Sequence, residues 1–488
     1  METESSMAVA REDGLREQTE RGDQNCEQAD SSASQFVRLE DWPVWRKWIY
    51  IVLVAYCDCL TFLVSMMLAP SVPQVLATFR PNGGDKSLGS FCVTVYILGF
   101  CVGPLLLGPL TDIYGRTILY RIYIVAYLAL TIACALSPSL EALIVFRFFA
   151  GCFGGAPMSI GGAVIADMYP PGRRGGPMAC YSAGTMLGPT LGPVLGGIIT
   201  GQIDWRWVFW IAAILAAIGA IGLFFILPET HLPTLRKRQA RSKSGTSRFV
   251  SMVQSSSGPS ICQTLSRTVR LPARIALHPA CSLILIFMCI FNGLVNVILS
   301  SLGSVYQAAY QFPTTTAGLS YLGMGIGRLV ALAVAKCSTS IVARRVGGPE
   351  GENKPENALP FLFSVGPLGS LGLIWYGWSL QERSPWIVPI IGLFLYGFTY
   401  MSVRLCTQIF LVEAVPNYSA SALAAHTFAS SIGGAIIPLA TFPLYDGVGY
   451  GWGNTIIATV NLAICVIPLI MFVLSRRLAK TWKIEVIL

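Results

Sequence analysis

The chain has 488 residues, of which 53% are hydrophobic and only 12% are charged, and its mean hydropathy is +0.60. A soluble domain carries about 25% charged residues, so this composition excludes a soluble globular protein. The net charge of +9 is no evidence of nucleic-acid binding. Because unpaired backbone groups cannot face lipid, the composition predicts an all-α polytopic membrane protein.

The first 44 residues are polar and acid-rich, and we predict a disordered tail without the apolar core of a signal peptide. Apolar runs then recur along the chain, each close to the roughly 20 residues that one membrane span needs. The first six are expected at 48–70, 90–107, 117–136, 141–167, 178–200 and 206–227. Six more are expected at 279–300, 315–337, 360–380, 386–411, 418–444 and 455–475. The predicted architecture is therefore twelve spans in two pseudo-symmetric bundles of six.

A polar segment separates the two sets of spans. It is serine-rich in patches and carries nine Lys or Arg residues and one Glu, which is typical of a linker. The predicted domain plan is a tail over 1–44, a bundle over 45–227, the basic linker over 228–278, a second bundle over 279–475 and a second tail over 476–488.

The distribution of Lys and Arg predicts the orientation. If the N-terminus is cytoplasmic, the opposite side carries only Arg80, Lys86, Arg206 and Arg383. Cytoplasmic loops are enriched in Lys and Arg, so we expect the termini and the linker in the cytoplasm. The expected location is the plasma membrane, with the vacuolar membrane as the alternative, and the expected state is a monomer in the lipid bilayer.

Soluble catalytic motifs are missing. The sequence has no P-loop, no dinucleotide-binding glycine fingerprint, no H-E-x-x-H and no G-x-S-x-G. Its fourteen cysteines are scattered without a CxxC pair and are interpreted as small core residues. We therefore expect no enzyme activity, no cofactor, no metal and no ATP as the driving force.

A short polar stretch, Gly108-Pro-Leu-Thr-Asp-Ile-Tyr-Gly-Arg116, separates the second and third runs. Gly108 and Gly115 permit a tight turn, Asp112 is expected just before the next helix, where a carboxylate is favoured, and Arg116 can pair with acids or lipid phosphates. The alternative is an ordinary membrane loop. The stretch resembles the G-x-L-x-D-x-x-G-R signature of the major facilitator superfamily, although Ile113 and Thr117 stand where the family usually has basic residues.

A faint internal repeat relates the two halves. Span four ends with Asp167 three residues before Pro170, and span ten ends with Glu413 three residues before Pro416. Repeated halves are typical of transporters with a site between them. We expect a conformational gate formed by Gly108, Asp112, Gly115, Arg116, Asp167 and Glu413.

Span five carries glycines every four residues, interrupted by prolines: Gly184, Gly188, Pro189, Gly192, Pro193, Gly196 and Gly197. Such a face permits close helix packing, and prolines bend a helix. The two interpretations are packing alone or a hinge. The run resembles the G-x-x-x-G-P-x-x-G-G signature of the superfamily's antiporter branches, and that resemblance implies substrate export in exchange for protons.

Two charges are expected inside the first half. Arg147 lies in span four, where a charge is costly and usually functional, and Asp58 lies in span one. The arginine resembles the one in the family's span-four motif, which takes part in proton coupling. We expect Asp58 and Arg147 to couple protons, with a purely structural pair as the alternative.

The second half contains embedded arginines without an embedded acid. Arg328 lies in span eight, and Tyr400, Arg404 and Gln408 share one face of span ten. Asn292, Asn296 and His426 are further polar groups in spans seven and eleven, and Glu413 lies at a helix end. A substrate anion could pair with these arginines. The alternative is that they bind backbone carbonyls or extend to an interface.

Together these features resemble the twelve-span drug:proton antiporter branch of the superfamily, fungal in type. The first hypothesis is a proton-coupled exporter of a small organic compound, such as a secondary metabolite, toxin or organic acid, with a leaning to carboxylates. One alternative is a multidrug exporter of cationic or neutral drugs. A second is a transport-inactive membrane receptor or scaffold.

Overall fold

The computed structural model describes residues 42–80, 86–169, 175–229, 270, 272–346, 359–415 and 419–477. The expected N-terminal tail, most of the linker and residues 478–488 lie outside these ranges. Within them the chain is helical and no strand is assigned. This confirms the all-α fold class.

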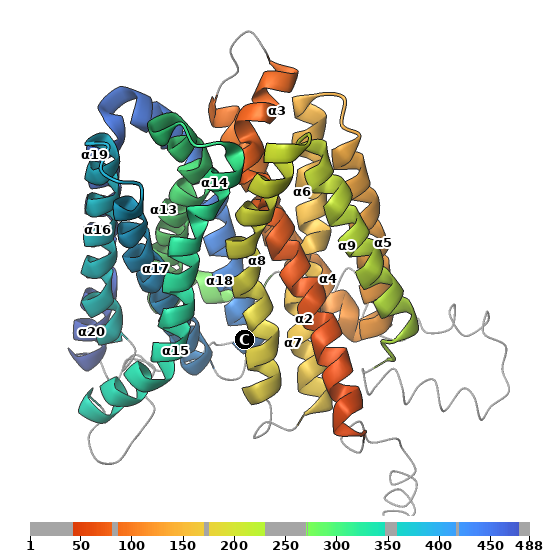
Figure 1. Ribbon diagram of the computed structural model, residues 1–488. Helices are drawn as coiled ribbons and strands as arrows, with labels where there is room; N and C mark the ends of the chain where they lie inside the picture. The colour runs from red at the N-terminus through yellow and green to blue at the C-terminus, as the bar shows by residue number, and fades with distance from the viewer. Residues whose placement is uncertain are drawn as a thin grey trace, which may run out of the picture.

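The N-terminal bundle contains six membrane crossings (Figure 1). Several crossings are built from more than one helix, because prolines or glycines interrupt them. They are α2 (Val44–Met67) with η2 (Ala69–Ser71) and α3 (Val72–Phe79), α4 (Lys86–Tyr114), α5 (Arg116–Ala135), α6 (Leu140–Gly154) with α7 (Ala156–Met168), α8 (Gly175–Gln202), and α9 (Arg206–Phe225).

The C-terminal bundle repeats this plan. Its elements are α13 (Pro279–Tyr310), α14 (Thr314–Leu319) with α15 (Tyr321–Val346), α16 (Leu359–Gln381), α17 (Ile387–Ala414), α18 (Ser419–Ile436) with η6 (Ile437–Ala440), α19 (Thr441–Ile464) and α20 (Val466–Arg477). Helix α19 is kinked at Gly449, whose φ of 79° suits glycine. The chain turns there from the eleventh crossing into the twelfth.

Nine stretches of the described residues are long and apolar enough to cross a membrane, and one of them, 421–471, contains the last two crossings. Helices α8 and α16 are not among the nine. Both nevertheless lie alongside the other spans in the bundle (Figure 1). The three-dimensional arrangement therefore supports twelve crossings.

Helix α8 packs against helices of both bundles. Its Gly184, Gly188, Gly192 and Gly196 face the backbone of α2, and a Cβ added to Gly196 would overlap the carbonyl oxygen of Met67. Gly197 instead faces the other bundle, where an added Cβ would lie 2.6 Å from the carbonyl oxygen of Thr314. The glycine face thus allows close packing on two sides, and a hinge role for it stays a prediction.

The two bundles also meet at the end of the molecule that carries η2 and α14 (Figure 1). There the side-chain amide of Gln307 donates to the carbonyl oxygen of Pro70 at 3.0 Å, and a Cβ on Gly303 would lie 2.9 Å from Pro70 Cα. Nearer the middle, Thr94 Oγ1 donates to the carbonyl oxygen of Ala435 at 3.2 Å. These contacts hold the two bundles together on that side of the central space.

We expect Gly196→Ala to lower the midpoint of thermal unfolding of the purified protein in detergent. Overpacking a tight contact costs about 1–3 kcal/mol. Gly176→Ala in the same helix is the matched control, because nothing lies within 4 Å of its added Cβ. Equal midpoints for the two variants would contradict the close packing of α8 on α2.

Candidate functional site

A cavity that opens to solvent lies between the two bundles. Its walls are contributed by α2, α4, α7 and α8 on one side and by α13, α15, α17 and α18 on the other. A membrane transporter of repeated halves is expected to have its site at such an interface. The two walls differ sharply in chemistry.

The N-terminal wall is mostly apolar. Phe62 and Phe100 lie with ring centroids 5.2 Å apart at an interplanar angle of 61°. The wall as a whole is formed by Phe62, Ser65, Met66, Ile97, Phe100, Met158, Thr185, Met186 and Pro189. No charged side chain is part of it within the described residues.

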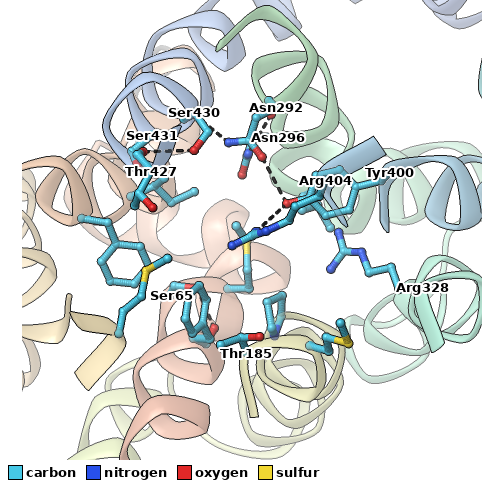
Figure 2. Close-up of a pocket in the computed structure, with 18 of the residues that line it drawn as sticks. Ser65, Thr185, Asn292, Asn296, Arg328, Tyr400, Arg404, Thr427, Ser430 and Ser431 are labelled. Atoms are coloured by element: carbon cyan, nitrogen blue, oxygen red, sulfur yellow. Dashed lines mark hydrogen bonds between the residues drawn. The ribbon is translucent and has the colours of Figure 1, made fainter. Parts of the chain in front are cut away.

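The C-terminal wall contains a chain of hydrogen bonds (Figure 2). Arg404 Nη1 donates to the Tyr400 hydroxyl at 3.0 Å, and that hydroxyl donates to Asn292 Oδ1 at 3.2 Å. Asn292 Nδ2 in turn donates to the carbonyl oxygen of Ser430 at 2.7 Å. The chain links three helices and holds the Arg404 side chain toward the cavity. The wall is completed by Asn296, Leu299, Arg328, Met401, Thr427 and Ser431.

Arg328 is the second cation of this wall and is only 4% exposed. Its guanidinium carbon lies 4.8 Å from the centroid of the Tyr400 ring, a cation–π contact, and Nη2 contacts Met324 Sδ at 3.7 Å. Its Nε is buried without a hydrogen-bond acceptor. Tyr400 therefore separates two guanidinium groups, and no carboxylate is among the described lining residues.

Asp58 lies next to the cavity on the same face of α2 as Phe62 and Ser65, at positions i, i+4 and i+7. It is fully buried, and its Oδ1 accepts a hydrogen bond from the Tyr181 hydroxyl at 3.2 Å. Tyr181 and the lining residue Thr185 are likewise i and i+4 on α8. The pair thus lies one turn from the cavity, and Asp58 Oδ2 has no hydrogen-bond donor in the described part of the chain.

Arg147 makes no ion pair with Asp58 in this structure. Its guanidinium carbon lies 4.9 Å from the centroid of the Tyr96 ring. It donates to backbone carbonyls at the joint between α2 and α4, those of Val64 (3.2 Å), Ser65 (3.0 Å), Cys92 (3.0 Å) and Val93 (3.5 Å). This geometry is that of a structural cross-link, and a proton-coupling role for Arg147 stays a prediction.

We expect Arg147→Lys to lower the thermal unfolding midpoint clearly, because lysine lacks the planar fork of donors. Each carbonyl left without a donor costs roughly 1–3 kcal/mol. Arg80→Lys is the control, since Arg80 forms an exposed ion pair with Glu141 at 2.7 Å and such pairs contribute little. If Arg147→Lys melts like the wild type and loses only transport, the cross-link interpretation fails.

Two residues of the predicted gate, Arg116 and Asp167, are in contact, and their gating role stays a prediction. Arg116 Nε donates to Asp167 Oδ2 at 3.3 Å, and Nη1 contacts the Thr111 hydroxyl. Three further members of the set lie in helices, namely Gly108, Asp112 and Glu413. What surrounds these three residues lies outside the described part of the structure. Of the predicted gate, the structure therefore describes only the contact between Arg116 and Asp167.

One expectation for this region was wrong. Helix α4 continues to Tyr114, so Asp112 lies inside its last turn rather than just before α5. The carboxylate at the N-terminus of α5 is Glu229, whose Oε1 accepts from the Arg116 backbone N–H at 2.8 Å. Gly115 has a φ of 97°, and a Cβ there would lie 2.6 Å from the Glu229 carboxylate. The sequence signal was a lone acid directly after span six, at the start of a basic segment.

Two predicted substrate residues are not part of the cavity lining. His426 is buried, with Nε2 3.2 Å from the Thr407 hydroxyl. Gln408 lies on the same stripe of α17 as Tyr400 and Arg404, but two turns from Tyr400. The structure brings together Asn292, Asn296, Arg328, Tyr400 and Arg404.

Comparison with known proteins identifies the family of the chain. The model of the Major Facilitator Superfamily matches residues 54–438. The chain belongs to the major facilitator superfamily. Among its relatives in this superfamily is the efflux pump radE of Floropilus chiversii, which is 34% identical over 92% of this chain and 84% of its own. The MFS-type transporter tndD of Aspergillus flavipes is 37% identical over 89% of this chain and 82% of its own.

Solved structures of the superfamily share the fold. The partially occluded inward open form of the xylose transporter XylE from E. coli superposes with a TM-score of 0.63 at 17% identity, covering 88% of this chain and 97% of XylE. The protein is thus a multi-pass membrane transporter of small molecules and not an enzyme.

Proposed function

We propose that the protein is a proton-coupled exporter of small organic compounds that carry a carboxylate. The observation that carries this proposal is the pair Arg328 and Arg404 on one cavity wall, with no acid among the described lining residues. A buried charge without a partner is costly. An arginine fork matches a carboxylate bidentately, so an anionic substrate would satisfy both cations.

The same observation disfavours a multidrug exporter of cationic drugs. Two guanidinium groups on one wall would repel a cationic substrate. A neutral substrate would leave the two arginines without a counterion. The carboxylate-bearing compound is therefore preferred.

Asp58 is the proposed carrier of the proton. An ionised carboxylate is expensive in a buried site, and Tyr181 gives Asp58 only one donor in the described residues.

The direction of transport and the orientation are also proposals. Relatives named as efflux pumps, together with the antiporter-like glycine run of α8, support export. The start of α2 and the end of α20 lie at the same end of the molecule (Figure 1). We propose that this end faces the cytoplasm. The domain boundaries and the plasma-membrane location are proposed as the sequence predicts them.

We expect carboxylic acids to raise the unfolding midpoint of the purified protein more than their methyl esters do. Arg328→Lys and Arg404→Lys should each weaken acid binding by roughly 10-fold or more. Lysine keeps the positive charge but loses the second hydrogen bond of the bidentate contact, and a hydrogen bond to a charged group contributes about 1.5–3 kcal/mol. Arg206→Lys is the control, since Arg206 pairs at the surface with Asp204 at 3.6 Å. Esters that bind as well as acids would exclude the anion site.

Asp58→Asn should abolish substrate uptake into proteoliposomes driven by an acidic interior, while substrate exchange without a pH gradient continues. The neutral amide cannot release a proton, yet it keeps the shape of the carboxyl group and the Tyr181 contact. Asp204→Asn serves as the matched control at an exposed position. Gradient-driven uptake by Asp58→Asn at the wild-type rate would show that another group carries the proton.

A further inference from the structure

The two phenylalanines of the N-terminal wall are held in a fixed arrangement. Phe100 packs edge-to-face against Phe62 and also against Tyr96, with ring centroids 5.2 Å apart in both pairs. Phe62 is 9% exposed and Phe100 is 5% exposed, so each offers only a small part of its surface to the cavity. A ring entering the cavity would meet aromatic edges and faces whose orientation is already set.

Three methionines line the same side of the cavity as these rings. Met66, Met158 and Met186 come from α2, α7 and α8 and all line the cavity. Their thioethers are polarisable and unbranched, so they follow the outline of different rings and make favourable contacts with them. Met66 and Met186 are nearly buried.

The two walls of the cavity differ in polarity. The rings and most of the methionines belong to the N-terminal wall, whereas both arginines and both asparagines belong to the opposite wall. The labelled Arg404 side chain points into the space between the walls (Figure 2). A ligand that touches both walls must have an acidic end and an apolar body.

We infer that the substrate is an aromatic carboxylic acid, with its ring on Phe62, Phe100 and the methionines and its carboxylate toward Arg404 and Arg328. The acid end rests on the proposed function, and the aromatic body is the addition. A saturated body would gain burial alone. A flat ring gains edge-to-face and sulfur contacts as well, which together favour it by about 2- to 12-fold in affinity, equivalent to ~0.5–1.5 kcal/mol.

The test compares two acids with the same carbon skeleton, naphthalene-2-carboxylate and decahydronaphthalene-2-carboxylate, by calorimetric titration of the purified full-length protein. The saturated acid is the more hydrophobic of the two, so a merely apolar wall would bind it at least as well. We expect the aromatic acid to bind at least 2-fold more tightly. Equal affinities, a tighter saturated acid, or binding of neither acid would overturn the inference.

Phe62→Leu and Phe100→Leu refine the test, because leucine keeps the wall apolar and removes the ring. Each should bring the ratio of the two affinities toward one. Phe225→Leu is the control, since Phe225 is 85% exposed at the end of α9. If the ratio of the two affinities is unchanged in both variants, the ring does not bind against Phe62 and Phe100. If neither variant folds, the ratio measured on the wild-type protein still tests the inference.

The methyl ester of the aromatic acid separates this inference from the function on which it rests. If the ester binds as tightly as the acid while the aromatic preference persists, the anion site fails and the ring wall stands. If the acid is preferred over the ester but the saturated acid binds equally well, the anion site stands and the aromatic inference fails.

Discussion

The structure depends on one constraint: a charged or polar group inside a membrane-spanning bundle must find its partners within the protein. Arg147, Asp58, Arg328 and Arg404 meet this constraint in different ways. Arg147 uses backbone carbonyls of two neighbouring helices and is satisfied by the fold itself. Among the described residues, Asp58 and Arg328 are only partly satisfied, Arg404 donates to the Tyr400 hydroxyl, and all three lie at or next to the cavity.

That difference separates a charge that the backbone satisfies from charged groups that keep a buried atom without a partner among the described residues. A group with all its hydrogen-bond partners in the backbone cannot change its state without disturbing the helices. Asp58 and Arg328 each keep a buried polar atom without a protein partner among the described residues. Such incomplete satisfaction is costly in a resting core, but it is what a site needs if a proton or a substrate is to supply the missing contact.

Glycine determines where the bundles can meet. The glycine face of α8 allows its backbone to approach α2, and Gly197 and Gly318 do the same across the interface between the bundles. Side chains with a Cβ at these positions would move the helices apart. The cavity lies where this close glycine packing ends. There the facing residues have larger side chains, such as Phe62 and Tyr400, which keep the helices apart. The same interface therefore combines a tight contact at one end with an open space near its centre.

The sequence by itself determined the helical class, the approximate spans, the superfamily and the grouping of Tyr400 with Arg404, because hydrophobic length and helical period are local properties. Only the tertiary structure decided which residues from distant helices meet. Tyr181 binds Asp58 from 123 residues away, and Glu229 reaches the start of α5 from 113 residues away. Period alone placed Gln408 with Tyr400, yet eight residues along a helix are about 12 Å, which takes its side chain past the cavity. The helical period sets the angle of each side chain around the helix axis. The position along the axis at which two helices come together depends on packing. That position determines which side chains line the cavity.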